Sequence, residues 1–155
     1  MEKRRLSSTE VAASGMINNH EQMENGELRF RLRNENDGSG YVRIVAGTEG
    51  AWQNAHFHTG VRECVIVQKG WMAFAKKIDG GIHMRILREE EMIVSEPGVV
   101  HNTYLPVGAI IHCVKFGSNV AEKISGKADW HSSPEFDKLT KSLSEYQIMF
   151  RANQC

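Results

Sequence analysis

The chain has 155 residues, of which 41% are hydrophobic, so it is long enough to form one domain with a buried core. Its 19 Lys and Arg residues balance 19 Asp and Glu residues, which gives a net charge of zero when histidine is neutral. This balance argues against binding to nucleic acid or to an anionic membrane, since both require an excess of positive charge. No apolar run reaches the length of a membrane span, and the polar start of the chain does not resemble a signal peptide.

Three cysteines, Cys64, Cys113 and Cys155, are widely separated and odd in number. Such cysteines are typical of reduced thiols, so we expect a cytoplasmic protein without a disulfide framework. The seven histidines are the remaining compositional feature, and their positions carry the functional argument.

The first 25 residues are small and polar, which predicts an irregular N-terminal arm, either solvated or packed on a neighbour. From Leu28 to Arg33, leucine or phenylalanine alternates with arginine, as expected for a strand with one buried and one solvent-exposed face. Turn residues separate further short strands, predicted at 41–46, 52–58, 63–68, 71–78, 81–87, 91–94, 102–105 and 109–116. This pattern predicts an all-β domain, an antiparallel barrel or double-sheet sandwich over residues 26–118.

The C-terminal extension, residues 119–155, has a different pattern. Ser133, Pro134 and Glu135 form a helix-start signal, and apolar residues then recur at helical spacing. We predict one amphipathic α-helix at about residues 134–150 that closes one end of the barrel.

His56 and His58 flank Phe57 on a predicted strand, so their side chains project from the same face. Thr59 and Gly60 supply a turn that brings Glu63 back on a neighbouring strand. Two imidazoles beside a carboxylate suit a first-row transition metal. A pair of exposed histidines on a strand face is the alternative interpretation.

The pattern extends to five residues, separated by five, one, four and six intervening positions: Gly50, His56, His58, Glu63 and Gly70. Their spacing resembles the complete first motif of the cupin superfamily. The segment Pro97-Gly98-Val99-Val100-His101 resembles part of the second motif, with glycine three residues before histidine. The sequence departs from that motif where the family has an upstream glycine, a proline and an asparagine, at Glu90, Glu96 and Leu105.

The resemblance implies an antiparallel double-stranded β-helix, the cupin or jelly-roll barrel. It also implies that one divalent transition metal (Fe, Mn, Ni, Co, Cu or Zn) is held by His56, His58, Glu63 and His101. Such a ligand set leaves two octahedral positions open for a substrate or dioxygen. A cupin that holds its histidines free of metal is the alternative. Small cupins commonly pair through their outer strands, so the resemblance also implies a homodimer.

Two further residues are candidates for catalysis. Thr103 shares the strand parity of His101 and could present its hydroxyl near the metal, or be an ordinary strand threonine. His112 lies among apolar residues of the last predicted strand, where it could move protons or be hydrogen-bonded in a core or interface. By parity, Trp52 faces inward, whereas Tyr104 faces outward.

Charged side chains on two other strands suggest further hypotheses. Arg43 could clamp a carboxylate or phosphate if its strand face is the inner one. His83 and Arg85 share a strand face that could bind an anion, although a solvent-exposed face explains them equally well.

Three functions remain open at this point. The first is a metal-dependent enzyme, an isomerase or dioxygenase that acts on a sugar, sugar phosphate or keto acid. The second is a non-catalytic cupin that binds or senses a small molecule. The third is a metal-free scaffold, because the cupin fold hosts many functions.

Overall fold

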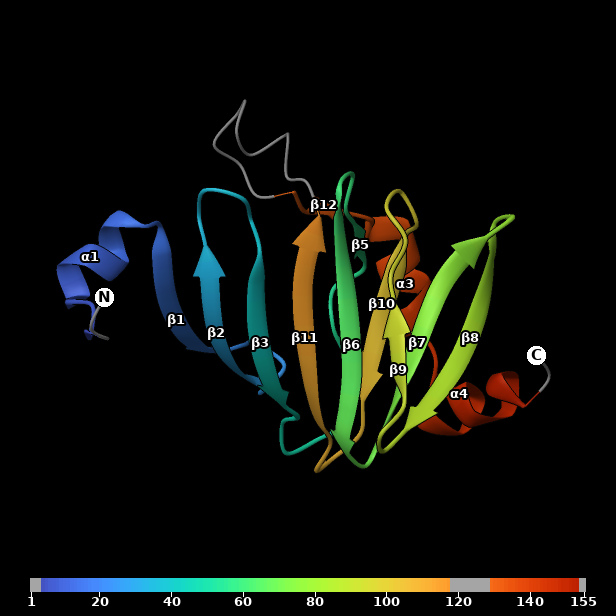
Figure 1. Cartoon of the computed structure of the whole chain (residues 1–155). Helices are drawn as coiled ribbons and strands as arrows, with labels where there is room; N and C mark the ends of the chain where they lie inside the picture. The colour runs from blue at the N-terminus through green and yellow to red at the C-terminus, as the bar shows by residue number, and fades with distance from the viewer. Residues whose placement is uncertain (1–3, 118–128, 154–155) are drawn as a thin grey trace.

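A computed structural model describes residues 4–117 and 129–153. Two antiparallel sheets lie face to face, which confirms the all-β class and the double-sheet architecture (Figure 1). The first sheet has the order β1 (Met16–Gln22), β2 (Leu28–Asn34), β3 (Gly40–Val45), β11 (Ile110–Gly117), β6 (Val61–Lys69) and β9 (Met92–Val94). The second has the order β12 (His131–Ser132), β5 (His56–Phe57), β10 (His101–Leu105), β7 (Trp71–Ile78) and β8 (Gly81–Arg88), and β4 (Ala51–Trp52) pairs with β10.

The main core fills the space between the two sheets. Alternate residues of β3, β6 and β11 project inward and meet side chains of β7, β8 and β10. Buried side chains of this core are Val42, Ile44, Val65, Val67, Met72, Phe74, Leu87, Leu105, Ala109, Ile111 and Cys113. Burial of this apolar surface is the main force that holds the sheets together.

Two helices cover the outer face of the second sheet, α3 (Pro134–Lys141) and α4 (Glu145–Ala152) (Figure 1). Phe136 and Ile148 are fully buried there, against a second core that includes Trp52 and Tyr104. The prediction of a single helix at 134–150 is therefore wrong. Ser144 begins a new helix because its side chain and that of Gln147 form a capping box, a signal that the sequence contains.

The prediction of an irregular N-terminal arm is also wrong for the described part of residues 1–25. A short helix, α1 (Ser8–Ala13), precedes β1, and β1 pairs along its whole length with β2. Most β1 side chains are polar and exposed, so no apolar periodicity revealed the strand. Backbone hydrogen bonds to the edge of the sheet form it instead.

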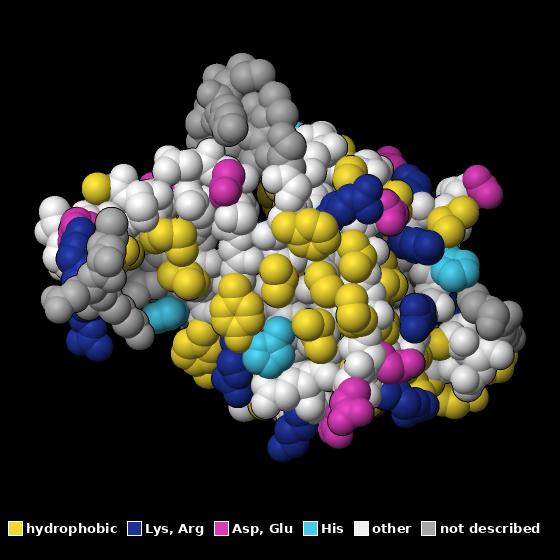
Figure 2. Space-filling model, in the orientation of Figure 1, with side chains coloured by type: hydrophobic (Ala, Val, Ile, Leu, Met, Phe, Trp, Pro, Cys, Tyr) yellow, Lys and Arg dark blue, Asp and Glu magenta, His cyan; other side chains and the backbone are white. Residues whose placement is uncertain are grey.

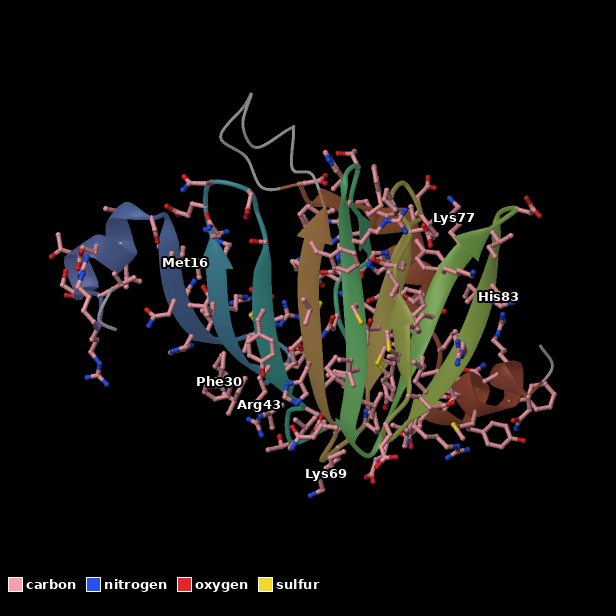
Figure 3. The ribbon with its side chains drawn as sticks, in the orientation of Figure 1. Met16, Phe30, Arg43, Lys69, Lys77 and His83 are labelled. Carbon is pink, nitrogen blue, oxygen red and sulfur yellow. The ribbon has the colours of Figure 1, made fainter. Side chains whose placement is uncertain are left out.

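The arginines of β2 face the interior of the barrel, whereas its apolar residues face solvent. In the register with β3, Arg29 lies opposite Ile44 and Arg31 opposite Val42, both inward-facing core residues. Phe30 therefore lies on the outer side with Arg43, whose guanidinium is 6.0 Å from the Phe30 ring centroid (Figure 3). The alternation within β2 was predicted correctly. The prediction that its apolar side is buried is wrong, because the arginine side faces the core.

The outer face of the first sheet is consequently rich in apolar side chains. Hydrophobic groups gather over β11, β6 and β9 in the view of Figure 2. We define the outer face by its exposed large hydrophobic residues: Leu28, Phe30, Leu32, Tyr41, Met92, Val114 and Phe116. A cluster of this size on one side of a sheet is a feature of interaction surfaces.

Within the described ranges, no helix has both the length and the apolar character needed to cross a membrane.

Candidate metal centre

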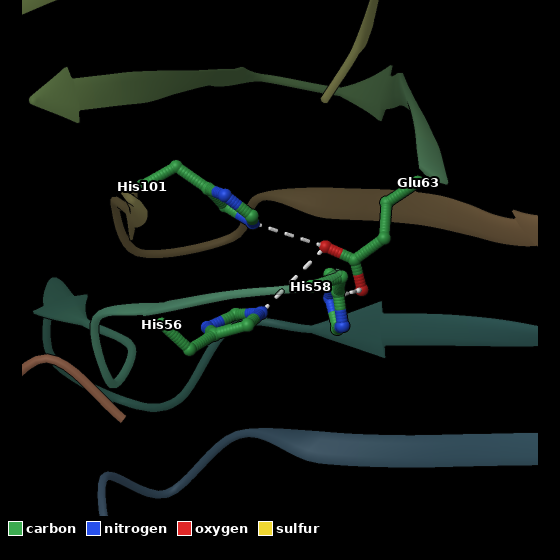
Figure 4. A group of neighbouring side chains, drawn as sticks. All are labelled: His56, His58, Glu63 and His101. Atoms are coloured by element: carbon green, nitrogen blue, oxygen red, sulfur yellow. Dashed lines mark hydrogen bonds and ion pairs between the residues drawn. The ribbon is translucent and has the colours of Figure 1, made fainter. Parts of the chain in front are cut away.

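Four predicted ligands come together between the two sheets (Figure 4). His56 lies on β5 and His101 begins β10, and these two residues are direct partners in the antiparallel register. His58 follows β5 in the turn, and Glu63 projects inward from β6. One potential ligand atom from each residue lies within 4.8 Å of the others.

The carboxylate of Glu63 lies at the centre of the group. Its Oε2 is 3.2 Å from His101 Nε2 and 3.7 Å from His56 Nε2. Its Oε1 is 3.4 Å from His58 Nε2. All three imidazoles thus turn the same nitrogen, Nε2, toward one carboxylate.

The hydrogen bonds of the opposite ring nitrogens determine the protonation of the imidazoles. His56 Nδ1 donates to Asn54 O at 2.8 Å, and His101 Nδ1 donates to Val99 O at 3.0 Å. His58 Nδ1 donates to the carbonyl of Asp129. A carbonyl oxygen can only accept, so Nδ1 carries the proton of each neutral ring and Nε2 has a free lone pair.

These free nitrogens are buried, which is the observation that fits a metal ion. His56 Nε2 and His58 Nε2 have no hydrogen-bond partner among the described residues, although both atoms are inaccessible to solvent. Buried polar atoms without partners are costly. Three lone pairs that converge on a carboxylate are compensated by a cation, and imidazole with carboxylate is a donor set for divalent transition metals.

Charges around the site keep Glu63 ionised. Burial alone would raise its pKa, but the Lys115 ammonium and the histidines together hold the pKa of Glu63 well below its usual range. Lys115 Nζ lies 2.8 Å from Glu63 Oε1. Burial lowers the pKa of His56, which favours the neutral imidazole that a metal requires.

Asp129 fixes the loop that carries His58. Its carboxylate accepts hydrogen bonds from Thr59 N, Thr59 Oγ1, Gly60 N and Val61 N, at 2.8 to 3.0 Å. Burial raises the pKa of Asp129, but these hydrogen bonds outweigh burial and leave that pKa well below the ordinary value. Asp129 therefore links the segment before β12 to the turn between β5 and β6.

Asp129→Asn is expected to lower the free energy of unfolding by about 3 kcal/mol at pH 7, because an amide cannot accept all these hydrogen bonds. A depressed folded-state pKa stabilises the protein above the unfolded pKa of about 4, and this contribution disappears as the pH falls below that value. Urea unfolding between pH 7 and pH 3 measures the difference between wild type and variant, which should narrow below about pH 4. Asp79→Asn, in an exposed turn, is the control and should change little. A difference that is constant with pH would contradict this account of Asp129.

A cavity of about 270 Å³ opens beside the cluster. His56, Glu63 and His101 form part of its wall. The other lining residues are Arg29, Arg31, Val42, Ile44, Gln53, Val65, Phe74, Thr103, Ile111, Cys113, Lys115 and Trp130. Trp130 stacks on the His56 ring, with 5.3 Å between the centroids, so one side of the entrance is aromatic.

The two predicted catalytic candidates differ in position. Thr103 is buried and lines the cavity, on the side that its parity with His101 predicted. His112 does not reach the cavity: its Nδ1 is 2.6 Å from Tyr41 Oη and its Nε2 is 2.6 Å from Gln68 Oε1, both on the outer side. The inward residues of β11 are Ile111 and Cys113, so the structure does not place His112 where it could act on a molecule in the cavity, and the hydrogen-bonded alternative fits its position.

Other predicted candidates also lie away from the cavity. Trp52 packs edge-on against Tyr104 beneath the helices, because the chain leaves its strand between β4 and β5 and the parity with His56 is lost. Arg43 is on the outer face. His83 and Arg85 are exposed on β8, at the far edge of the sheet, which agrees with the solvent-face interpretation (Figure 3 labels His83).

Sequence reasoning missed the cationic part of the cavity, namely Arg29, Arg31 and Lys115. The alternation within β2 could not indicate which side faces inward. Lys115 lies on the same side of its strand as Ile111 and Cys113, which could have indicated that it faces inward. The strand is apolar on both sides up to Val114, however, so the sequence did not show which side is the inner one.

Comparison with solved structures identifies the architecture. The structure is similar to oxalate decarboxylase of Lactobacillus farciminis, with a TM-score of 0.56 and 13% identity over 77% of this chain and 35% of that chain. It is similar to the capsular polysaccharide assembling protein CapF of Staphylococcus aureus, with a TM-score of 0.57 and 12% identity over 75% of this chain and 32% of that one. It is also similar to the cupin domain of Drosophila melanogaster CENP-C, with a TM-score of 0.51 and 15% identity over 72% of this chain and 82% of that one.

The chain has a cupin fold. This confirms the fold that the two motifs implied. The cupin-fold chain spans about a third of the oxalate decarboxylase and CapF chains, at 35% and 32% of their lengths. No family model and no curated protein matches the sequence. The similarity therefore concerns the fold, and function has to be argued from the site.

Proposed function

We propose that this cupin is a metal-dependent enzyme that acts on a small polar metabolite. One observation carries the proposal: the Nε2 atoms of His56, His58 and His101 all point toward the buried Glu63 carboxylate beside a cavity, and those of His56 and His58 are buried without a hydrogen-bond partner among the described residues. His56, His58, Glu63 and His101 would hold one divalent transition metal (Fe, Mn, Ni, Co, Cu or Zn). Such a metal supplies Lewis-acid polarisation of an oxygen-bearing group or, for iron, reactivity toward dioxygen.

Protein groups around the cavity support isomerase- or oxygenase-type chemistry. The Thr103 hydroxyl and the Lys115 ammonium line the cavity and can hold or donate a proton. Trp130 and the apolar wall around Phe74 exclude water from one side of a bound molecule. The fold neighbours include an oxalate decarboxylase, which supports an enzyme of this architecture.

A cupin that binds or senses a small molecule without turnover is the alternative. It is favoured by the ion pair between Lys115 and Glu63, which occupies the side chain best placed to transfer a proton. The same residues would hold the metal in either case.

Two measurements on one substrate panel separate these functions. The Fe(II)-loaded protein is incubated with keto acids, hydroxy acids and sugar phosphates, and dioxygen uptake is recorded. In parallel, deuterium incorporation from D₂O next to the carbonyl group reports isomerase-type proton exchange. Either signal supports the enzyme. Saturable binding of a panel member with neither signal would support the binding protein and contradict the enzyme.

We also propose that the chain forms a homodimer through its outer face. A two-fold interface brings the same patch of two copies together, so a patch with a large net charge would repel itself. The outer face meets this requirement, because Arg43 lies against Phe30, and Arg62, opposite Phe116, is neutralised by an ion pair with Glu96 at 2.8 Å. Five strands about 4.8 Å apart and about seven residues long span roughly 24 by 23 Å, or about 550 Å². This is about two thirds of one side of a standard interface, which buries about 800 Å² per partner.

The cysteines are consistent with a cytoplasmic location, which we propose from their arrangement. Cys64 and Cys113 are free thiols on the neighbouring strands β6 and β11. Cys64 shares its side of the sheet with Val114, whereas Cys113 faces the cavity, so the two thiols point apart and cannot pair. Cys155 lies outside the described residues.

A further inference from the structure

The arginines of β2 face the cavity rather than solvent, so the structure has to compensate their positive charge there. Arginines rarely face a barrel interior unless a charged partner or ligand compensates them. Arg29 and Arg31 lie on the inner side of β2, and Lys115 enters the same space from β11. Among the described residues, the charged side chains that line the cavity are thus these three cations and one carboxylate, Glu63.

Arg29 is held as a fixed donor. Its Nε and Nη2 donate to Glu27 Oε2 at 3.1 and 2.9 Å, and Glu27 is only 1% exposed. Gln53 Nε2 donates to both oxygens of Glu27 at 3.3 and 3.1 Å, which orients that carboxylate. This arrangement uses one edge of the guanidinium and leaves Nη1 to contact a ligand.

Arg31 has weaker partners. Its Nη1 donates to Glu21, whose side chain is 46% exposed on β1, and its Nη2 contacts Met23 Sδ at 3.8 Å. An exposed ion pair contributes little, so an anion in the cavity can compete with Glu21 for this guanidinium. Lys115 is paired with Glu63, which would share its negative charge with a bound metal.

We propose that the cavity selects small anionic substrates, whose carboxylate or phosphate binds Arg31 and Arg29 while an oxygen-bearing group approaches the histidine cluster. The inference rests on the proposed function and narrows it from polar metabolites in general to acids. A guanidinium presents two parallel donors that match the two oxygens of a carboxylate or phosphate. A cavity of about 270 Å³ limits such a substrate to a few carbon atoms.

Three probes with one carbon skeleton test the proposal: glycerol, D-glycerate and glycerol 3-phosphate. Their dissociation constants are measured by isothermal titration calorimetry on the metal-loaded protein, and metal content is determined on the same samples. We expect at least one anion to bind tenfold or more tightly than glycerol. The stronger of the two anions identifies the group as carboxylate or phosphate.

Arg31→Gln is the informative variant, because its ion pair with the exposed Glu21 adds little stability, so we expect the barrel to stay folded without it. It should weaken the binding of the preferred anion about tenfold and leave glycerol binding and metal content unchanged. Arg33→Gln is the matched control. Arg33 lies on the same strand and the same side as Arg31, but it pairs with Glu35 and does not line the cavity. It should bind the anion as wild type does.

Two results would overturn the inference. One is a metal-loaded wild type that binds glycerol as tightly as either anion, and the other is an Arg31→Gln variant that matches Arg33→Gln. Both leave the metal proposal standing. A wild type without metal contradicts the proposed function instead, whatever the probes do.

Discussion

Replacing His101 with alanine is expected to reduce bound metal from near one equivalent per chain to less than a tenth. His101 supplies one of three Nε2 atoms around Glu63, and it bridges β10 to β5 opposite His56. Loss of a partner that merely orients a metal ligand weakens metal binding 10- to 100-fold, so loss of a ligand itself should cost at least about 100-fold. Metal content of the purified variant, measured by elemental analysis, gives the result.

The His101 variant should stay folded, because its ring packs on Phe74 at 5.3 Å but contributes only part of the core. Circular dichroism and the unfolding temperature check this point. His83→Ala is the control, since His83 is exposed on β8 and should retain full metal content. Stoichiometric metal in a folded His101→Ala protein would show that the metal is held elsewhere.

Val114→Asp is expected to convert the proposed homodimer into a monomer. Val114 lies at the middle of the outer face, opposite Tyr41 of β3 and Cys64 of β6. A two-fold interface would bring two new carboxylates together and desolvate them, which should weaken association at least about 100-fold. Analytical ultracentrifugation over a concentration series measures the dissociation constant.

Val107→Asp provides the matched control for this experiment. Val107 is 65% exposed in the turn between β10 and β11, away from the outer face. It should leave the dimer intact. The dimer proposal fails if the wild type sediments as a monomer, or if Val114→Asp associates as strongly as wild type.

The sequence predicted which residues form the cluster, because three of the four are close together in the chain and local strand and turn geometry brings them together. A two-residue period sends His56 and His58 to one region, and a short turn returns Glu63 on the adjacent strand. The motif's Gly50 also has a packing reason, since a Cβ there would lie 2.1 Å from Tyr104 Oη. Where the family's second motif has glycine, Glu90 adopts φ 71°, so the turn persists with a strained residue.

The orientation of β2 and β11 could not be predicted, because it depends on partners distant in sequence. In β2, alternating apolar and arginine residues fit either face, and the core residues of β3 decide between them. In β11, Ile110 to Val114 is apolar on both sides except for His112. Tyr41 and Gln68, which accommodate His112 on the outer side, come from two other strands. Register between strands, rather than local pattern, fixes which residues surround the site.

The central claim is that the buried histidines and Glu63 hold a metal ion, and elemental analysis of the purified wild-type protein tests it most directly. The protein is expressed with Fe, Mn, Ni, Co, Cu and Zn available and is purified without chelators. We expect close to one divalent transition metal per chain, which should be lost on dialysis against a chelator at low pH because the imidazoles become protonated. A wild-type protein that contains no more metal than the His101→Ala variant under these conditions would contradict it.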